Sequence, residues 1–254
     1  MFDHITIRAG DRKESELFYD TVLRTIGVAQ TSRDETYTVW GGDFSLAHAD
    51  DDNPVTRHLH VGFVALSRQH VDAFWRAGVD AGYTDDGAPG PRPQYREDYY
   101  GGFLLDPDGN SAEAVHHENV RRPGHVDHLS IRVADVAAAA RFYALIAPHA
   151  GYEVAGEQPD RARFVGKGGS FSLVAGTPTE HLHMAFPAHD DATVDAFHRA
   201  AIEAGYRDNG PPGERPHYHP GYYAGYVLDP DGNNIEVVYH GPGKRSADAV
   251  VIRW

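Results

Sequence analysis

The sequence predicts an α+β protein of four modules, each made of one strand, one helix and three further strands. A long internal repeat is the first reason: residues 59–117 return as residues 182–240 at a constant offset of 123, with more than half of the positions identical. The opening segments FDHITIRAGD and VDHLSIRVAD repeat in the same way, at an offset of 124. Within each repeat the apolar spacing alternates between strand and helix periods. We therefore expect two domains, residues 1–118 and 125–241, followed by a C-terminal tail at 242–254.

The first module is predicted from the opening residues. Alternation over ITIRA (5–9) predicts a strand, and Asp11 is placed to cap the helix that follows. The apolar face of that helix is expected to contain Leu17, Phe18, Val22 and Ile26. TYTVWG (36–41) and FSLAHA (44–49) then predict two strands, separated by a pair of glycines.

The second module follows an acidic loop. HLHVGFVAL (58–66) predicts a strand, Ser67 a helix cap and Gly82 the end of that helix. Its apolar face is expected to contain Val71, Phe74, Trp75 and Val79. GGFLL (101–105) and SAEAVHH (111–117) predict a hairpin, after which residues 118–124 resemble a linker and the pattern restarts.

Composition limits the class of protein. Apolar residues make up 41% and charged residues 24% of the chain, and no apolar run approaches membrane-spanning length. The strand pattern begins so early that a signal peptide is not expected, which favours the cytoplasm. A formal charge of −14 argues against a nucleic-acid partner and suits a small-molecule partner. Because the chain has no cysteine, any metal must be held by nitrogen and oxygen donors.

Strand parity predicts which side chains share a face. His4, Thr6 and Arg8 lie on one side of the opening strand, and the two isoleucines between them lie on the other. The same parity places His60 and Glu113 opposite apolar neighbours. Because the apolar side must cover the helices, the polar side faces solvent or a cavity. Each repeat holds two histidines and one glutamate in this way, which favours a cavity with paired metal sites.

The sequence also resembles a known family. FDHITIR with a following FY, H-[VM]-[GA]-F, a helix ending in AGY, and LDPDGN-x-x-E together resemble the vicinal oxygen chelate superfamily. It includes glyoxalase I, extradiol dioxygenases, fosfomycin-inactivating enzymes and bleomycin-resistance proteins. The resemblance covers residues 2–117 and 126–240, and implies four βαβββ modules with two modules around each cavity. The fused chain would then be a pseudo-dimer, present as a monomer or a homodimer.

The resemblance also implies metal ligands. They fall on His4, His60, Glu113, His128, His183 and Glu236. Two imidazoles and one carboxylate leave several metal positions open, which suits Fe(II), with Mn(II) or Zn(II) as alternatives. His58 and His181, two residues before the middle ligands, are rival ligands or outer partners. His4 could join Glu113 in its own repeat or Glu236 in the other, and we favour the exchanged arrangement.

Further site residues follow from differences between the repeats. Glyoxalase I-like sites use a fourth carboxylate ligand, but FSLAHA and FSLVAG (171–176) contain no acid, which favours the three-ligand pattern. Tyr226 stands ten residues before Glu236, as the active-site Tyr of extradiol dioxygenases does, and the first repeat has Phe103 there. His219 is aligned with Arg96. Tyr226 and His219 are the predicted acid–base residues. Arg8 and Arg132 are predicted to hold an anionic substrate group or a neighbouring carboxylate.

These observations favour a metal-dependent enzyme acting on a small oxygenated molecule by dioxygenase-type chemistry. A drug- or metabolite-sequestering binding protein of the bleomycin-resistance type is one alternative. A metal-dependent lyase or isomerase is another. The sequence leaves open the substrate, the metal and the activity of each site.

Overall fold

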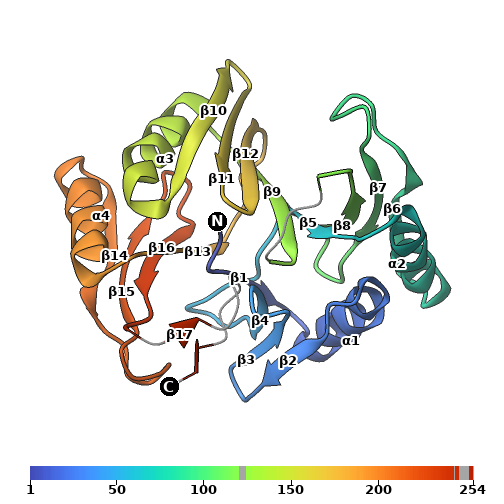
Figure 1. Cartoon of the computed structure of the whole chain (residues 1–254), viewed down its shortest axis with the longest axis horizontal. Helices are drawn as coiled ribbons and strands as arrows, with labels where there is room; N and C mark the ends of the chain where they lie inside the picture. Colours follow the sequence, from blue (N-terminus) through green and yellow to red (C-terminus); the bar gives the residue numbers. More distant parts are fainter. Residues whose placement is uncertain (120–123, 243, 246–251, 254) are drawn as a thin grey trace.

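Two eight-stranded mixed sheets form the framework of the protein (Figure 1). The computed structural model describes residues 1–119, 124–242, 244–245 and 252–253. Sheet A has the strand order β14-β15-β16-β13-β1-β4-β3-β2, and sheet B the order β10-β11-β12-β9-β5-β8-β7-β6. The predicted α+β class and its four modules are confirmed.

The modules have the predicted order of one strand, one helix and three strands. Module 1 contains β1 (His4–Ala9), α1 (Arg12–Leu23) with the short 3₁₀ helix η1 (Arg24–Ile26), β2 (Gln30–Arg33), β3 (Tyr37–Trp40) and β4 (Phe44–His48). Module 2 contains β5 (Leu59–Val64), α2 (Arg68–Asp80), β6 (Thr84–Pro91), β7 (Tyr100–Leu105) and β8 (Ser111–His116). Module 3 contains β9 (Val126–Val133), α3 (Val136–Ala150), β10 (Tyr152–Gln158), β11 (Arg161–Gly166) and β12 (Gly169–Ala175). Module 4 contains β13 (His183–Pro187), α4 (Asp191–Glu203), β14 (Arg207–Glu214), β15 (Tyr223–Leu228) and β16 (Asn234–Tyr239).

Each sheet combines one module from each half of the sequence. In sheet A, β1 pairs with β13 in antiparallel fashion, so module 1 adjoins module 4. In sheet B, β5 pairs with β9, so module 2 adjoins module 3. The helices pair differently, because α1 contacts α2 and α3 contacts α4. The two halves are thus interleaved: helices pack within a half, and sheets join the halves. The division into two domains at residues 1–118 and 125–241 therefore remains a prediction from the sequence repeat.

Local sequence signals explain the first two helices. Asp11 accepts hydrogen bonds from the backbone N–H groups of Lys13 and Glu14, and Ser67 accepts one from that of His70, so both predicted caps are present. The prediction for Leu17 was wrong, because this side chain is 57% exposed. Phe18, Val22 and Ile26 are buried as predicted, and Tyr19 is buried on this face in place of Leu17.

Tyrosines 19 and 143 anchor the helices of modules 1 and 3. Both are fully buried. Each phenol donates a hydrogen bond of 2.9 Å to a buried aspartate in the LDPDGN turn of the neighbouring module, Asp106 or Asp229. The recurring turn motif is therefore part of the core and links modules within each half.

Some sequence predictions fall partly outside the described residues. Residues 120–123 of the expected linker lie outside them, as do residues 243, 246–251 and 254 of the expected tail. The described part of the tail contains the short ladder β17 (Lys244–Arg245) and β18 (Ile252–Arg253).

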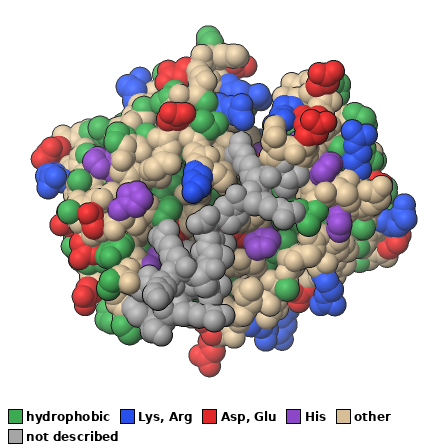
Figure 2. Space-filling model, in the orientation of Figure 1, with side chains coloured by type: hydrophobic (Ala, Val, Ile, Leu, Met, Phe, Trp, Pro, Cys, Tyr) green, Lys and Arg blue, Asp and Glu red, His purple; other side chains and the backbone are tan. Residues whose placement is uncertain are grey.

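The surface shows no segregation of charge on the face in Figure 2, where acidic and basic side chains are interspersed. Over the described ranges, none of the helices combines the length and the apolar character that crossing a membrane requires.

Candidate metal centres

The structure groups the six predicted ligands into two sites. Site 1 contains His4 from β1, His183 from β13 and Glu236 from β16. Site 2 is made of the other three predicted ligands, one each from β5, β8 and β9: His60, Glu113 and His128. Each site therefore draws on both halves of the chain. The favoured exchanged arrangement is the one observed, and it follows from the β1–β13 and β5–β9 pairings.

The ligand atoms of each site converge on a small volume. In site 2 the Nε2 atom of His60 lies 3.0 Å from the Oε2 atom of Glu113 and 3.1 Å from the Nε2 atom of His128. His128 Nε2 lies 3.3 Å from the same oxygen. In site 1 the corresponding separations are 2.9, 3.0 and 3.6 Å. Both glutamates are 1% exposed.

These distances fit a divalent cation. Three ligand atoms about 2.1 Å from one ion, at right angles to each other, lie about 3.0 Å apart. A buried carboxylate beside two imidazole nitrogens at this spacing also needs a positive charge among them. A metal ion would supply that charge, and in its absence a proton on one imidazole does so.

Aspartates orient one histidine in each site. The Nδ1–H group of His4 donates to Asp3, and that of His128 to Asp127, each at 3.0 Å. This leaves each Nε2 atom free to face the other ligands. Burial alone would lower the pKa of His128, but the hydrogen bonds to Asp127 and Glu113 raise it to about 10.

Both sites favour a proton on the histidine that contacts an aspartate, which is His4 in site 1 and His128 in site 2. In site 1, burial lowers the pKa of His4, but Asp3 and Glu236 outweigh this effect and raise the pKa above its ordinary value. Burial lowers the pKa of His183, and Glu236 only partly offsets this effect. The pKa of Glu236 is lowered despite its burial, because His183 and His4 stabilise the carboxylate.

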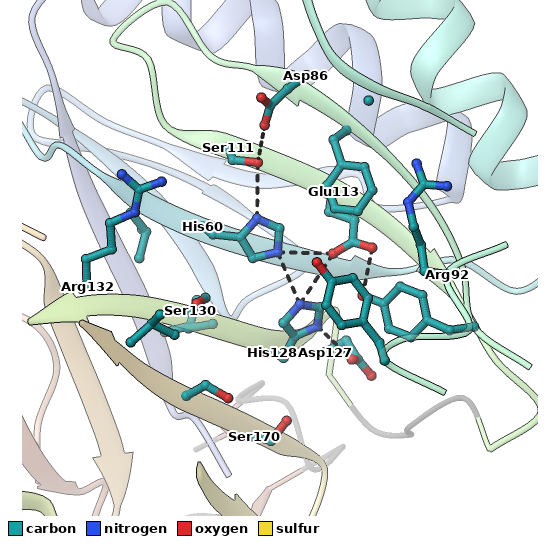
Figure 3. A pocket seen from close by; sticks show the side chains of 18 of the residues that line it. His60, Asp86, Arg92, Ser111, Glu113, Asp127, His128, Ser130, Arg132 and Ser170 are labelled. Carbon is teal, nitrogen blue, oxygen red and sulfur yellow. Dashed lines mark hydrogen bonds and ion pairs between the residues drawn. The ribbon is translucent and has the colours of Figure 1, made fainter. Parts of the chain in front are cut away.

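The other histidine of site 2 is oriented by a hydroxyl group. The Ser111 hydroxyl donates to Asp86 at 2.7 Å, so its oxygen accepts from the Nδ1–H group of His60 at 3.1 Å (Figure 3). This series of hydrogen bonds places the proton of His60 on Nδ1 and leaves its Nε2 atom unprotonated, as a metal ligand must be. In site 1 the aligned residues are Asn234 and Asn209, whose amides can serve either tautomer of His183.

A buried tyrosine holds the second oxygen of each glutamate. Tyr99 donates to Oε1 of Glu113 at 2.7 Å, and Tyr222 to Oε1 of Glu236 at 2.6 Å. These phenols leave Oε2 of each carboxylate to face the histidines.

The predicted acid–base residues both lie on the site 1 side. Tyr226 is the cross-strand partner of Glu236, and its ring centroid is 6.4 Å from that of His183. Burial and the neighbouring Glu236 raise the pKa of Tyr226 above its ordinary value of 10. At neutral pH this phenol is therefore protonated and acts as a hydrogen-bond donor. Its counterpart in site 2, Phe103, lies beside the ring of His60.

His219 lies farther from the ligands. Its Nε2 atom is 2.9 Å from Nδ1 of His240, whose Nε2 atom is 2.8 Å from Asp3. The connection to His4 therefore passes through two side chains. At site 2 the equivalent of His240 is His117, which contacts Asp127 at 3.2 Å. Its Nδ1 atom is buried with no hydrogen-bond partner among the described residues.

The remaining predicted residues lie around the rim. Arg8 donates to the backbone carbonyl of His48, and Arg132 lines the cavity of site 2. His58 has a left-handed backbone (φ 59°) and its ring donates to the carbonyl of Pro178. His181 shares this backbone conformation (φ 57°), and neither residue belongs to a ligand group in the described chain.

Sequence reasoning missed the outer partners of the ligands. Their signal was present, because an aspartate precedes the first ligand in both repeats (Asp3 and Asp127). His117 and His240 also recur at the offset of 123. Repetition marks these positions but does not reveal their contacts.

Comparison with known proteins agrees with this architecture. The sequence model of the Glyoxalase/Bleomycin resistance protein/Dioxygenase superfamily matches residues 1–114 and 147–237, more than half of the chain. The chain belongs to this superfamily. A comparison with curated proteins gave no significant match.

Solved members of this superfamily share the fold. A glyoxalase I mutant (V278E) from Zea mays is 18% identical with a TM-score of 0.67, over 94% of this chain and 92% of that one. A putative dioxygenase from Bacillus subtilis is 18% identical with a TM-score of 0.64, over 95% of this chain and 86% of that one. At these identities the similarity establishes the fold alone.

Proposed function

We propose that this superfamily member is a metal-dependent enzyme that binds a small molecule through adjacent oxygen atoms and carries out dioxygenase-type chemistry. The observation that carries the proposal is the pair of His/His/Glu groups, each with its ligand atoms 2.9–3.6 Å apart. Fe(II) is the favoured metal, with Mn(II) or Zn(II) as alternatives. Bound Fe(II) would supply open coordination positions for two substrate oxygens and for O₂.

The protein side chains would prepare each site for this role. Tyr99 and Tyr222 fix the glutamates, and Asp3 and Asp127 keep the Nε2 atoms of the first histidines directed inward. Such outer partners usually contribute 10–100-fold to metal affinity or activity, by order of magnitude.

We assign the acid–base role to Tyr226 in site 1. Its phenol neighbours Glu236 and His183 and remains protonated at neutral pH, so it can deliver a proton or a hydrogen bond to a substrate oxygen. His219 is connected to His4 through His240 and Asp3. We therefore propose that His219 acts on site 1 by supporting Asp3. Because Phe103 replaces Tyr226 in site 2, turnover is assigned to site 1.

The first test is metal content. After anaerobic reconstitution with Fe(II), elemental analysis should find about two equivalents per chain. Glu113→Gln and Glu236→Gln, which preserve the shape of the side chain, should each remove about one. No stoichiometric metal in the folded protein would refute the enzyme proposal and favour a sequestering protein.

The second test addresses turnover, measured as oxygen consumption with a panel of catechols. Tyr226→Phe should lower turnover by about 10²–10⁴-fold with metal content unchanged, as expected for loss of a general acid. Tyr223→Phe is the matched control, because its phenol, on the same strand, contacts Asp195 of α4 instead. Full activity in Tyr226→Phe would refute the acid–base role of Tyr226. If activity were also lost in Glu113→Gln but not in Glu236→Gln, turnover would belong to site 2.

A further inference from the structure

The cavity of site 2 is lined by several arginines. It has a volume of about 710 Å³ and opens beside His60, Glu113 and His128. One wall comes from module 2 and includes Tyr99 and Phe103. The other wall comes from the β9, β12 and β11 strands of module 3. Figure 3 shows Ser130, Ser170 and Arg132 on this side, next to the ligand cluster.

The module 3 wall has a regular arrangement set by strand register. Ser130 of β9 pairs with Ser172 of β12, which pairs with Arg163 of β11. The next residues on this face, two positions farther from His128, pair in the same manner. Val174 of β12 pairs with Arg132 of β9 on one side and with Arg161 of β11 on the other. Paired residues and residues two apart share one face of a sheet, so these side chains face the same cavity as His128. Two hydroxyls thus stand next to the metal ligands, with three guanidinium groups beyond them.

These guanidinium groups form no ion pair within the described part of the chain. Among the residues that the structure describes, no ion pair or side-chain hydrogen bond is made by Arg132, Arg161 or Arg163, and all three are exposed. The arrangement is unusual in a chain with a formal charge of −14. Three unpaired guanidinium groups on one cavity wall attract an anion and match the geometry of a carboxylate or phosphate group.

Site 1 lacks this arrangement. In its wall Val39 and Tyr37 occupy the register positions of Arg163 and Arg161, since they pair with Ser45 and Ala47 of β4. The Tyr37 side chain lies beside Tyr218 of module 4, where burial and then Tyr37 raise the pKa of the Tyr218 phenol. Of the three arginines, only the equivalent of Arg132 is retained, as Arg8. The sheet walls beside the two sites therefore differ in charge although their ligand sets are the same.

We propose that site 2 binds a small anion whose carboxylate or phosphate group is held by Arg161, Arg163 and Arg132. The charged group would lie on the order of 7–10 Å from the ligand atoms, from the spacing of strands and of alternate residues. A molecule with one aromatic ring can span that distance, with adjacent oxygens at the metal and the charge among the arginines. The proposal deepens the proposed function and rests on it for the metal only.

A pair of probes that differ in one charged group tests this inference. Catechol and 3,4-dihydroxybenzoate both offer two adjacent oxygens, and only the second is a carboxylate. Binding of each is measured by calorimetry on the Zn(II)-loaded Glu236→Gln protein, in which site 1 is disabled and the metal is redox-inert. We expect 3,4-dihydroxybenzoate to bind at least about tenfold more tightly, the effect of one charge-assisted hydrogen bond.

The arginine variants separate a specific site from general attraction. Arg161→Gln/Arg163→Gln should abolish the preference and leave catechol binding unchanged. The control variant Arg141→Gln/Arg199→Gln removes the same number of charges from the exposed faces of α3 and α4. This variant should retain the preference for 3,4-dihydroxybenzoate. Equal binding of the two probes, or a preference that survives in Arg161→Gln/Arg163→Gln, would overturn the proposal.

A measurement without metal keeps this inference distinct from the proposed function. Benzoate binding to the metal-free protein should be weaker but should still depend on Arg161 and Arg163. If no metal binds but this dependence is found, the proposed function fails and the anion site stands. If metal binds and benzoate binding does not depend on the arginines, the anion site fails and the proposed function stands. If neither metal nor benzoate binds, both are refuted.

Discussion

Metal binding at site 2 is expected to release a proton from His128. In the metal-free protein, burial works against protonation, but Asp127 and Glu113 raise the pKa of His128 to about 10 from its ordinary 6.5. At pH 7 nearly every metal-free molecule then carries this proton. A metal requires the neutral imidazole, so binding releases about one proton and the observed Kd rises about tenfold for each pH unit below 10. Without metal, the interaction of protonated His128 with Asp127 and Glu113 stabilises the fold. This contribution is fully present below pH 6.5 and is lost as the pH rises through 10.

Calorimetry of Zn(II) binding to the Glu236→Gln protein measures the released proton. The apparent enthalpy, plotted against the ionisation enthalpy of the buffer between pH 7 and 8, should have a slope of about one proton. Asp127→Asn removes the carboxylate that holds the Nδ1–H group of His128 at 3.0 Å, and should lower that slope. A slope of zero at pH 7 in the Glu236→Gln protein would refute the reasoning.

Two further substitutions probe packing around the site and the core. Gly62→Ala would place a Cβ atom 2.6 Å from Nδ1 of His128, so the ring must move; Zn(II) affinity at site 2 should fall about 10–100-fold in a competitive chelator titration. Site 1, where the aligned residue is already Ala185, should be unaffected, and equal losses at both sites would contradict this explanation. Tyr19→Phe leaves the buried Asp106 without one of its donors and should lower the free energy of unfolding in urea by about 1–3 kcal/mol. A change below about 0.5 kcal/mol would show that this hydrogen bond contributes little.

The candidate ligands could be predicted because two independent patterns coincide on them. Strand parity places His4 opposite the fully buried Ile5, so its side chain must lie on the face away from the helices. Repetition then distinguishes such a residue from an ordinary polar side chain. Helix caps were predictable for a similar reason, since Asp11 and Ser67 act on backbone groups within three residues.

The grouping of ligands was less accessible from sequence. His4 is compatible with either glutamate, and only the pairing of β1 with β13 brings it to Glu236. Some of the outer contacts span long sequence separations, such as that of Asp3 with His240. No local pattern encodes these distances. The exposure of Leu17 was missed because Tyr19, whose phenol has a buried hydrogen-bond partner in Asp106, occupies the buried face of α1 instead.

The interleaving of the two halves explains how one chain can hold two unequal sites. Two identical single repeats that assembled in this way would be related by a twofold axis, so any change in one site would appear in both. Fusion removes that constraint, because Arg161 and Arg163 can arise in one wall while Tyr37 and Val39 remain in the other. Neither half can be discarded, since each supplies one ligand to one site and two to the other. Covalent linkage thus lets the two sites diverge in specificity while both repeats remain indispensable.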